Sequence, residues 1–323
     1  MDVLAVIVNY RTADLTLRSV RAALEALERF PGSRVWLVEN GSRDGSAARF
    51  REASAREGWG DRVTLIDSPE NLGFAGGVNL AVRPVLDSGI SPRYVYLLNS
   101  DARPEPDAIA VLVRFLDDHA EAGIAGSYIY GVDGVTHDTA FRFPSAASQL
   151  EEALGIGVVT RLLDRFVVSK PVPTETTRVD WLAGASMLIR REVFERVGLL
   201  DEGFFIYFEE TDFCRRAARM GLATWYVPES RVEHVGAAST GWKDFTKPRP
   251  AYWFEGRRHY FAKNHGRAYL WAANLAWLLG WLVGEPRRRL LGRRGPFPVR
   301  FVRDFVRYSF VPGRAARERS IRG

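Results

Sequence analysis

The sequence contains a single cysteine, Cys214, among its 323 residues. One cysteine excludes an internal disulfide and a metal cluster built from several thiolates, and it fits a reducing compartment such as the cytoplasm. The chain also lacks an uninterrupted run of about 18 apolar residues, so no conventional transmembrane helix is expected. Its first residues, MDVLAVIVNYR, carry no basic start and no cleavage site. They predict a core strand rather than a signal peptide.

The composition is that of a globular protein, with 46% hydrophobic and 26% charged residues. The length suits one domain of roughly 240 residues with an appendage, or two domains. The net charge of +6 favours anionic partners, which include nucleic acid, phosphorylated small molecules and anionic lipid. Charge alone does not choose among these three.

Short apolar runs alternate with helical patterns in the first part of the chain. The runs span residues 3–8, 34–40, 62–67 and 94–99. Between the first two runs, Leu17, Val20, Leu24 and Leu27 recur at spacings of three and four, as on one face of a helix. This alternation predicts a mostly parallel, doubly wound α/β sheet. Ligands bind such sheets outside the carboxyl ends of the strands.

Polar residues follow each of these four runs. They are Asn9-Tyr10, Glu39-Asn40, Asp67-Ser68 and Asn99-Ser100-Asp101. Strand ends generally meet polar loops, so each tip alone is weak evidence for a site. Together they favour a ligand site at the carboxyl edge of the sheet.

The order of elements becomes clear again after an irregular stretch at residues 128–178. A strand is predicted near residues 185–190, followed by a helix closed by Gly198. The sequence EETDFCRRAARMG predicts a second helix, which is closed by Gly221. Residues 223–230 predict a further strand.

Three features could carry chemistry. Asp101 at a strand tip could hold Mg²⁺ or Mn²⁺ through its carboxylate, or it could simply cap the turn that follows. A general base could come from one of three acids, Glu209, Glu210 and Asp212. Alternatively, these acids could simply lie at a helix N-terminus, where the helix dipole favours acidic side chains. His234 could ligate a metal or serve a structural role.

The glycine-rich stretch NLGFAGGVNLAV, residues 71–82, matches neither the dinucleotide-binding pattern nor a P-loop. The order of the motifs is more specific than any one of them. VIVNYRTADLTLRSVRAAL, VENGSRDGS, NLGFAGGVNLAV, LLNSDARPEPDAI, DWLAGASMLIRREVFERVGLLDEGFFIYFEETDFCRR and VPESRVEHVGAAST together resemble the family 2 glycosyltransferases, in particular their bacterial rhamnosyltransferase-like branch. The resemblance covers about residues 3–265. It implies a GT-A fold, a nucleotide-diphosphate-sugar donor, a divalent metal (Mn²⁺ or Mg²⁺) and inversion at the anomeric carbon by direct displacement.

The resemblance also implies roles for particular residues. Asp101 matches the last aspartate of the Asp-x-Asp motif, which ligates the metal, and His234 matches a late histidine that can add a ligand. Asn99 stands where an acid often stands, which leaves one carboxylate fewer for the metal. Glu210 matches the catalytic base, with Glu209 and Asp212 as alternatives.

The remaining matches concern binding. The residues matching the donor-binding segments are Asn9, Tyr10, Arg11, Glu39, Asn40, Asn71, Gly73 and Asn79. Trp181 and Gly184 match the acceptor-side pattern W-x-x-G.

The expected organisation is a catalytic domain at residues 1–250, with a nucleotide-sugar half (1–125) and an acceptor half (126–250). An aromatic and basic helical extension follows at 251–323. Within it, the Trp-rich segment 268–284 precedes a basic run and predicts a helix at a membrane interface. The alternatives are a helical hairpin that covers the catalytic domain or a dimer interface.

The resulting hypothesis is a cytoplasmic enzyme of bacterial surface-polysaccharide synthesis, with peripheral attachment to the inner face of the membrane. Its donor would be dTDP- or UDP-linked, with rhamnose favoured, and its acceptor a saccharide or a polyprenyl-linked saccharide. No nucleic-acid partner is expected. The alternatives are a nucleotidyltransferase, a nucleic-acid-binding protein and a non-catalytic sugar-nucleotide sensor.

Overall fold

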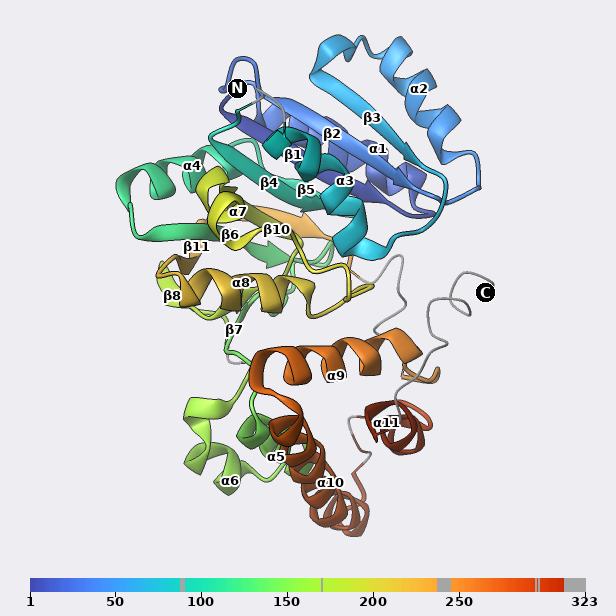
Figure 1. The fold of residues 1–323 in the computed structure, drawn as a ribbon, viewed down its shortest axis with the longest axis vertical. Coiled ribbons are helices and arrows are strands. Elements are labelled where there is room, and N and C mark those ends of the chain that lie inside the picture. The colour runs from blue at the N-terminus through green and yellow to red at the C-terminus, as the bar shows by residue number, and fades with distance from the viewer. Residues whose placement is uncertain (88–90, 170, 237–244, 294, 296, 311–323) are drawn as a thin grey trace. The chain divides into compact units, whose positions relative to one another are not determined.

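The structure is a computed structural model that describes residues 1–87, 91–169, 171–236, 245–293, 295 and 297–310. The chain forms two compact units (Figure 1). The first comprises residues 1–140, 171–205 and 209–241, and the second comprises residues 141–170, 206–208 and 242–323. The predicted boundary at residue 250 lies close to the last stretch of the second unit. The sequence did not predict that residues 141–170 would join that unit.

The first unit is built on one mixed sheet with the strand order β3-β2-β1-β4-β10-β6-β11-β5, and β8 also pairs with β11. Strands β3, β2, β1 and β4 are parallel to one another, β10 is antiparallel to both β4 and β6, and β11 is parallel to β6. The strands of this sheet are β1 (Val3–Asn9), β2 (Arg34–Asn40), β3 (Val63–Ser68), β4 (Tyr94–Asn99), β5 (Ala102–Pro104), β6 (Ala122–Tyr130), β8 (Thr177–Val179), β10 (Ser186–Arg190) and β11 (Ala223–His234). The short strands β7 (Ala140–Phe141) and β9 (Trp181–Leu182) form a separate pair. The predicted α/β class and the four parallel strands are confirmed.

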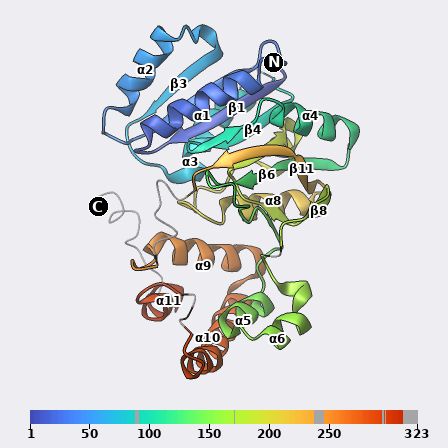
Figure 2. The ribbon, with the colours of Figure 1, turned by 180° about the vertical axis from the view of Figure 1, so that it is seen from behind.

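Helices cover both faces of this sheet, as Figures 1 and 2 show from opposite sides. They are α1 (Ala13–Ala26), α2 (Ser46–Arg56), α3 (Gly73–Asp87), α4 (Ala108–Asp118), α7 (Arg191–Val197) and α8 (Glu209–Arg219), with the 3-10 turn η1 (Gly60–Arg62). The expected helix ends are confirmed, because α7 ends before Gly198 and α8 ends shortly before Gly221. Both glycines have positive φ.

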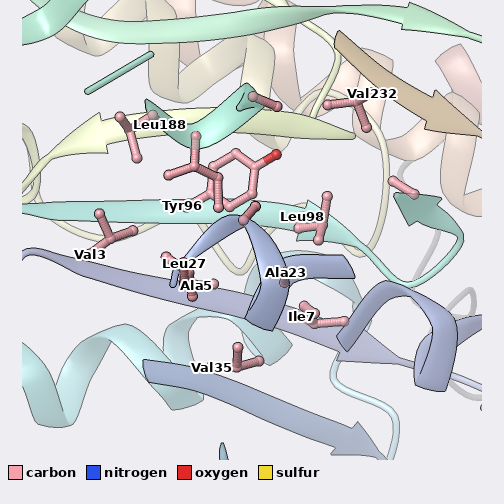
Figure 3. Close-up of a cluster of buried hydrophobic side chains, with 14 of the residues drawn as sticks. Val3, Ala5, Ile7, Ala23, Leu27, Val35, Tyr96, Leu98, Leu188 and Val232 are labelled. Carbon is pink, nitrogen blue, oxygen red and sulfur yellow. The ribbon is translucent and has the colours of Figure 1, made fainter. Parts of the chain in front are cut away.

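The core on the α1 side of the sheet explains the first apolar run of the sequence. Val3, Ala5 and Ile7 alternate along β1 and pack in one cluster with Tyr96 of β4 and Ala23 of α1 (Figure 3). The intervening residues of β1 are also buried, against the helices of the other face. A strand buried on both faces reads as a continuous apolar run rather than an alternating one.

The second unit is helical. It contains α5 (Ala146–Leu154), α6 (Gly157–Leu162), α9 (Ala251–His265), α10 (Arg267–Leu290) and α11 (Phe301–Phe310), with the 3-10 turn η2 (Asp164–Phe166). Its core joins Phe254 of α9, Trp277 of α10 and Phe305 of α11. The buried guanidinium of Arg257 donates hydrogen bonds to Gln149 and Asn274, at 2.7 and 2.6 Å.

Small residues let α10 lie close against α5, beside it in Figure 1. A Cβ atom added at Gly280 would lie 2.7 Å from the carbonyl oxygen of Leu150. A Cβ atom at Gly284 would lie 2.4 Å from the carbonyl oxygen of Leu154. Within the described ranges, no helix has the length and apolar character required to cross a membrane.

Candidate active site

Strand directions bring the predicted site residues to one edge of the sheet. Asn9 pairs with Glu39, and Val8 pairs with Asn99, so the tips of β1, β2 and β4 lie side by side. Strand β10 is antiparallel to both β4 and β6, which makes β6, and therefore β11, parallel to β4. His234 at the end of β11 consequently lies at the same carboxyl edge as Asp101. The tip of β3 differs from these in its surroundings, because the Asp67 side chain is exposed and forms an ion pair with Arg51.

Asp101 and His234 meet at this edge. The Nε2 atom of His234 lies 3.0 Å from Oδ1 of Asp101 and 3.4 Å from the amide nitrogen of Asn99. Both the histidine and aspartate side chains are largely buried, with exposed fractions of 15% and 10%. One carboxylate and one imidazole suit a divalent cation that takes its other ligands from a diphosphate and water. No group of three or more acidic, histidine or cysteine side chains in the described part of the chain is placed to hold a metal.

Asn9 is the centre of a buried hydrogen-bond network at the end of β1. Its Oδ1 accepts bonds from the hydroxyl groups of Thr12 and Thr16, at 3.2 and 2.7 Å. Its amide nitrogen donates to Ser42 at 3.2 Å. The Thr12 hydroxyl also lies 3.1 Å from the hydroxyl of Ser100. The residue preceding Asp101 is therefore fixed to the start of α1.

Sequence reasoning missed Thr12, Thr16 and Ser100 as supporting residues. The signal available was the placement of hydroxyl side chains three and seven residues after Asn9, a spacing that suits one face of the following helix. The contact with Ser100 joins residues 88 positions apart. Only the parallel pairing of β1 with β4 brings them together.

Glu39 and Asn40 use their polar atoms within the protein. Glu39 accepts hydrogen bonds from the backbone N–H groups of Gly41 and Ser42, at 3.1 and 2.8 Å. Asn40 donates to Asn71 and to the carbonyl oxygen of Gly73, at 3.1 and 2.9 Å. These bonds shape the loops after β2 and β3. Contact between either side chain and the nucleotide-sugar donor remains a prediction.

Gly73 and Asn79 hold α3 against the segment that leads to α8. Gly73 has φ of +73°, and a Cβ atom there would lie 2.0 Å from the carbonyl oxygen of Phe205. That carbonyl accepts a hydrogen bond from the N–H of Phe74 at 2.7 Å. Asn79 bonds to both backbone polar groups of Leu200, at 2.8 and 3.1 Å. The glycine-rich stretch thus allows close backbone approach, a role glycine commonly fills.

The first loop places two further predicted donor-binding residues. Tyr10 is half-buried and Arg11 is exposed. The guanidinium of Arg11 lies 5.1 Å from the centre of the Tyr10 ring. The backbone N–H of Arg11 donates to the hydroxyl of Ser42 at 2.9 Å, while its φ of +57° lies in the left-handed region. The loop therefore presents an aromatic ring and a cation next to the Asn9 network.

The three acids of α8 have different surroundings. Asp212 is fully buried and accepts a hydrogen bond from Nε of Arg216 at 2.8 Å. The same guanidinium donates to two backbone carbonyl oxygens, at 2.7 and 2.9 Å. These contacts give Asp212 a structural task. Glu209 and Glu210 each have one buried carboxylate oxygen without a hydrogen-bond partner.

Burial sets the acidity of this pair. Burial raises the pKa of Glu210 to about 7, while backbone N–H groups, including that of Gly184, oppose the rise. Burial and the neighbouring charge of Glu210 both raise the pKa of Glu209. A carboxylate with a pKa near neutrality matches the requirement for a general base at physiological pH. Glu210 is the less buried of the two, since it is half-buried whereas Glu209 is only 3% exposed.

Gly184 connects this acid to the metal-binding candidates. Its backbone N–H donates to Glu210. A Cβ atom at Gly184 would lie 4.0 Å from Oε1 of Glu210. The next residue, Ala185, accepts a hydrogen bond from the N–H of Asn99 at 3.1 Å. The predicted base, acceptor-side glycine and Asp-x-Asp segment are therefore neighbours, and half-buried Trp181 lies three residues before Gly184.

The backbone just before α8 is strained. Tyr207 and Phe208 both have φ of +73°, in the left-handed region that bulky side chains rarely adopt. Such conformations cost about 1–3 kcal/mol each and cluster at functional sites. Within the second unit, the two rings pack on α9 against Tyr252 and Trp253.

Residues 2–249 match the family model described as "Glycosyltransferase like family 2". The chain belongs to this family. The match spans most of the chain and includes every candidate site residue described above. The predicted family is confirmed.

Curated relatives of this family member include rhamnosyltransferases. The N-acetylglucosaminyl-diphospho-decaprenol L-rhamnosyltransferase of Mycobacterium tuberculosis (strain ATCC 25618 / H37Rv) is 29% identical over 262 residues, which are 74% of this chain and 78% of the relative. The rhamnosyltransferase WbbL of Escherichia coli (strain K12) is 26% identical over 164 residues, covering 50% of this chain and 60% of the relative.

Solved structures establish the fold of this family member as GT-A. The mannosyltransferase PcManGT of Pyrobaculum calidifontis, in complex with GDP-Man and Mn²⁺, superposes with a TM-score of 0.56 at 17% identity. The match covers 90% of this chain and 74% of the mannosyltransferase. GalNAc-T7 with UDP, GalNAc and Mn²⁺ gives a TM-score of 0.57 at 16% identity, covering 83% of this chain and 51% of GalNAc-T7.

Proposed function

We propose that this protein is an inverting, metal-dependent glycosyltransferase whose general base is Glu210. The observation that carries the proposal is the link from Glu210 through Gly184 and Ala185 to Asn99 and Asp101. It joins a buried carboxylate that has a free oxygen to the carboxylate and imidazole suited to a divalent cation. Family membership supports the same reaction class.

In the proposed reaction, Glu210 accepts the proton of an acceptor hydroxyl as that oxygen forms a bond to the anomeric carbon of the donor sugar. The bond between the anomeric carbon and the nucleoside diphosphate breaks at the opposite face, which inverts the configuration. The diphosphate leaves with the bonding electron pair. Asp101 and His234 would hold a Mn²⁺ or Mg²⁺ ion, which supplies Lewis-acid stabilisation of the leaving diphosphate.

The protein's own groups prepare this step in three ways. The Asn9–Thr12–Ser100 network fixes the turn that carries Asp101. The backbone N–H of Gly184 orients the Glu210 carboxylate and leaves its Oε2 atom unbonded. We assign acceptor contact to Trp181, which is close to Gly184 in sequence. We assign donor binding to the loops that carry Tyr10, Arg11 and Glu39.

Rhamnose from a dTDP- or UDP-linked donor is the favoured sugar, because curated relatives are rhamnosyltransferases. The favoured acceptor is a polyprenyl-diphosphate saccharide, which the decaprenol relative's name supports. The product would serve bacterial surface-polysaccharide synthesis at the cytoplasmic side of the membrane.

The test is transfer to N-acetylglucosaminyl-diphospho-polyprenol with dTDP-rhamnose and, separately, UDP-sugars, in the presence of Mn²⁺. Mass spectrometry should detect a product heavier by one sugar, and NMR should show an anomeric configuration opposite to that of the donor. Glu210→Gln should bind nucleotide and form product far more slowly than the wild type. Nucleotide binding without transfer to any acceptor would favour a non-catalytic sugar-nucleotide-binding protein.

A further inference from the structure

Helix α10 has two different faces. One face is buried within the second unit and carries Ala273, Trp277, Gly280 and Gly284. The other carries large apolar side chains that are half-exposed or more: Trp271 (55%), Leu275 (56%), Leu279 (50%), Leu282 (58%) and Val283 (57%). The structure therefore divides the apolar residues of the Trp-rich segment between a core face and a surface face.

The exposed residues form a continuous stripe, called here the α10 stripe. Their spacings of three and four place them along one side of the helix. At 1.5 Å per residue, the stripe from Trp271 to Val283 is about 18 Å long. Single exposed apolar residues are ordinary on protein surfaces, but contiguous apolar patches mark interaction sites.

Basic residues stand at both ends of the α10 stripe. Arg267 precedes it, and Arg287, Arg289 and Arg293 follow it, all exposed. The helix has one acidic residue, Glu285, which pairs with Arg288 and Arg289 at 3.4 and 2.9 Å. The stripe therefore ends in positive charge on both sides.

We infer that the α10 stripe and its flanking arginines form a docking surface for an anionic lipid bilayer, with α10 lying in the plane of the interface. An apolar face 5–10 Å deep in the headgroup region, with arginines at the phosphates, is the usual arrangement of such helices.

Charge argues against a second copy of this chain as the occupant. In an antiparallel pairing of two α10 helices, Arg267 of one copy would approach Arg287 and Arg289 of the other. In a parallel pairing, like ends would meet. Both arrangements oppose like charges across an interface, whereas anionic headgroups complement both ends.

The inference rests on the proposed function in one respect: lipid binding would bring the enzyme to a polyprenyl-linked acceptor, which resides in a membrane. Its test needs neither donor nor acceptor. Loss of transfer with intact lipid binding would count against the proposed function alone. Intact transfer to a soluble acceptor analogue without lipid binding would count against this inference alone.

The experiment is flotation of the full-length protein with phosphatidylcholine vesicles and with phosphatidylcholine–phosphatidylglycerol vesicles. We expect binding to the anionic vesicles that weakens with salt. Leu275→Glu with Leu279→Glu should reduce the bound fraction at least tenfold. Leu162→Glu, at an apolar residue of α6 that is 77% exposed, is the matched control and should float like the wild type.

Equal flotation of the double variant and the wild type would overturn the inference, since the vesicles would then be bound by another part of the chain, such as the basic residues beyond position 310. Failure of the wild type to float would also overturn it. So would a dimer, measured by light scattering, that the double variant converts to a monomer without any change in lipid binding.

A second measurement compares the wild type with Trp271→Phe and therefore does not depend on whether the double variant folds. Brominated anionic lipid should quench part of the tryptophan fluorescence, and Trp271→Phe should remove most of that quenching. Quenching unchanged in Trp271→Phe would place another part of the chain at the bilayer and contradict the assignment.

Discussion

Replacing Glu210 by glutamine should greatly lower the rate of transfer and, above neutral pH, make the protein more stable. Burial raises the pKa of Glu210 from an ordinary 4.5 to about 7. The folded protein therefore holds this proton more tightly than the unfolded chain does, and the free energy of unfolding falls as pH rises from about 4.5 to 7. The difference corresponds to at most about 3 kcal/mol, because solvent screens a partly exposed carboxylate.

The expected result has a defined pH dependence. At pH 4 the carboxyl is mostly protonated in both states, so wild type and Glu210→Gln should unfold at similar urea concentrations. At pH 8 the variant should be more stable, by about 1–3 kcal/mol. Transfer should fall by about 10²–10⁴-fold, the usual contribution of a general base. Urea unfolding at the two pH values and initial rates provide both measurements.

Glu209→Gln is the matched control. Burial and the charge of Glu210 raise the pKa of Glu209 well above its ordinary value, whereas the pKa of Glu210 is raised by burial. Removing the Glu209 carboxyl should therefore leave the rise of activity with pH nearly unchanged. The variant should keep substantial activity. If Glu209→Gln is inactive while Glu210→Gln transfers sugar, the assignment of the base is wrong. If Glu210→Gln is no more stable than wild type at pH 8, the buried-charge argument fails.

Two further predictions concern stability. Asp212→Asn should lower the free energy of unfolding by about 3 kcal/mol or more, because it leaves the Arg216 guanidinium without its buried carboxylate partner. The control is Glu195→Gln, which breaks a half-exposed ion pair on a helix and should change the free energy of unfolding by less than about 1 kcal/mol. Equal effects of the two substitutions would contradict the structural role of Asp212. Gly284→Ala should destabilise the second unit by about 1–3 kcal/mol, because the added Cβ meets the backbone of α5. Gly157→Ala, where a Cβ meets no atom within 4 Å, should be neutral or stabilising in the same thermal melt, so a similar loss from both substitutions would refute the close-packing argument.

The sequence predicted the first four strands well because of how a parallel sheet is buried. A strand such as Val3–Asn9 is covered on both faces, so its apolar run stands out from the surrounding amphipathic helices. Parallel pairing then forces the tips at Asn9, Glu39 and Asn99 to one edge. The edge of the sheet that carries the candidate site could be predicted from this local pattern.

The rest depended on contacts between residues distant in sequence. Asn79 forms a hydrogen bond with Leu200, which is 121 positions away, and no local sequence pattern predicts that contact. Strand β11 extends to His234 through an irregularity between Val227 and Arg231, so the predicted strand ended too early. Residues 141–170 have short elements with mixed periodicity. Their association with the C-terminal helices arises from packing such as that at Gly284.

The central claim is that the carboxyl edge of the sheet binds a nucleotide-diphosphate donor through Asp101 and a divalent metal. Calorimetric titration with dTDP, UDP and GDP, with Mn²⁺ and then with EDTA, tests it most directly. We expect one nucleotide to bind with Mn²⁺, and its affinity to fall at least tenfold with EDTA or in Asp101→Ala. Binding of no nucleotide, or binding indifferent to both metal and Asp101, would contradict the account.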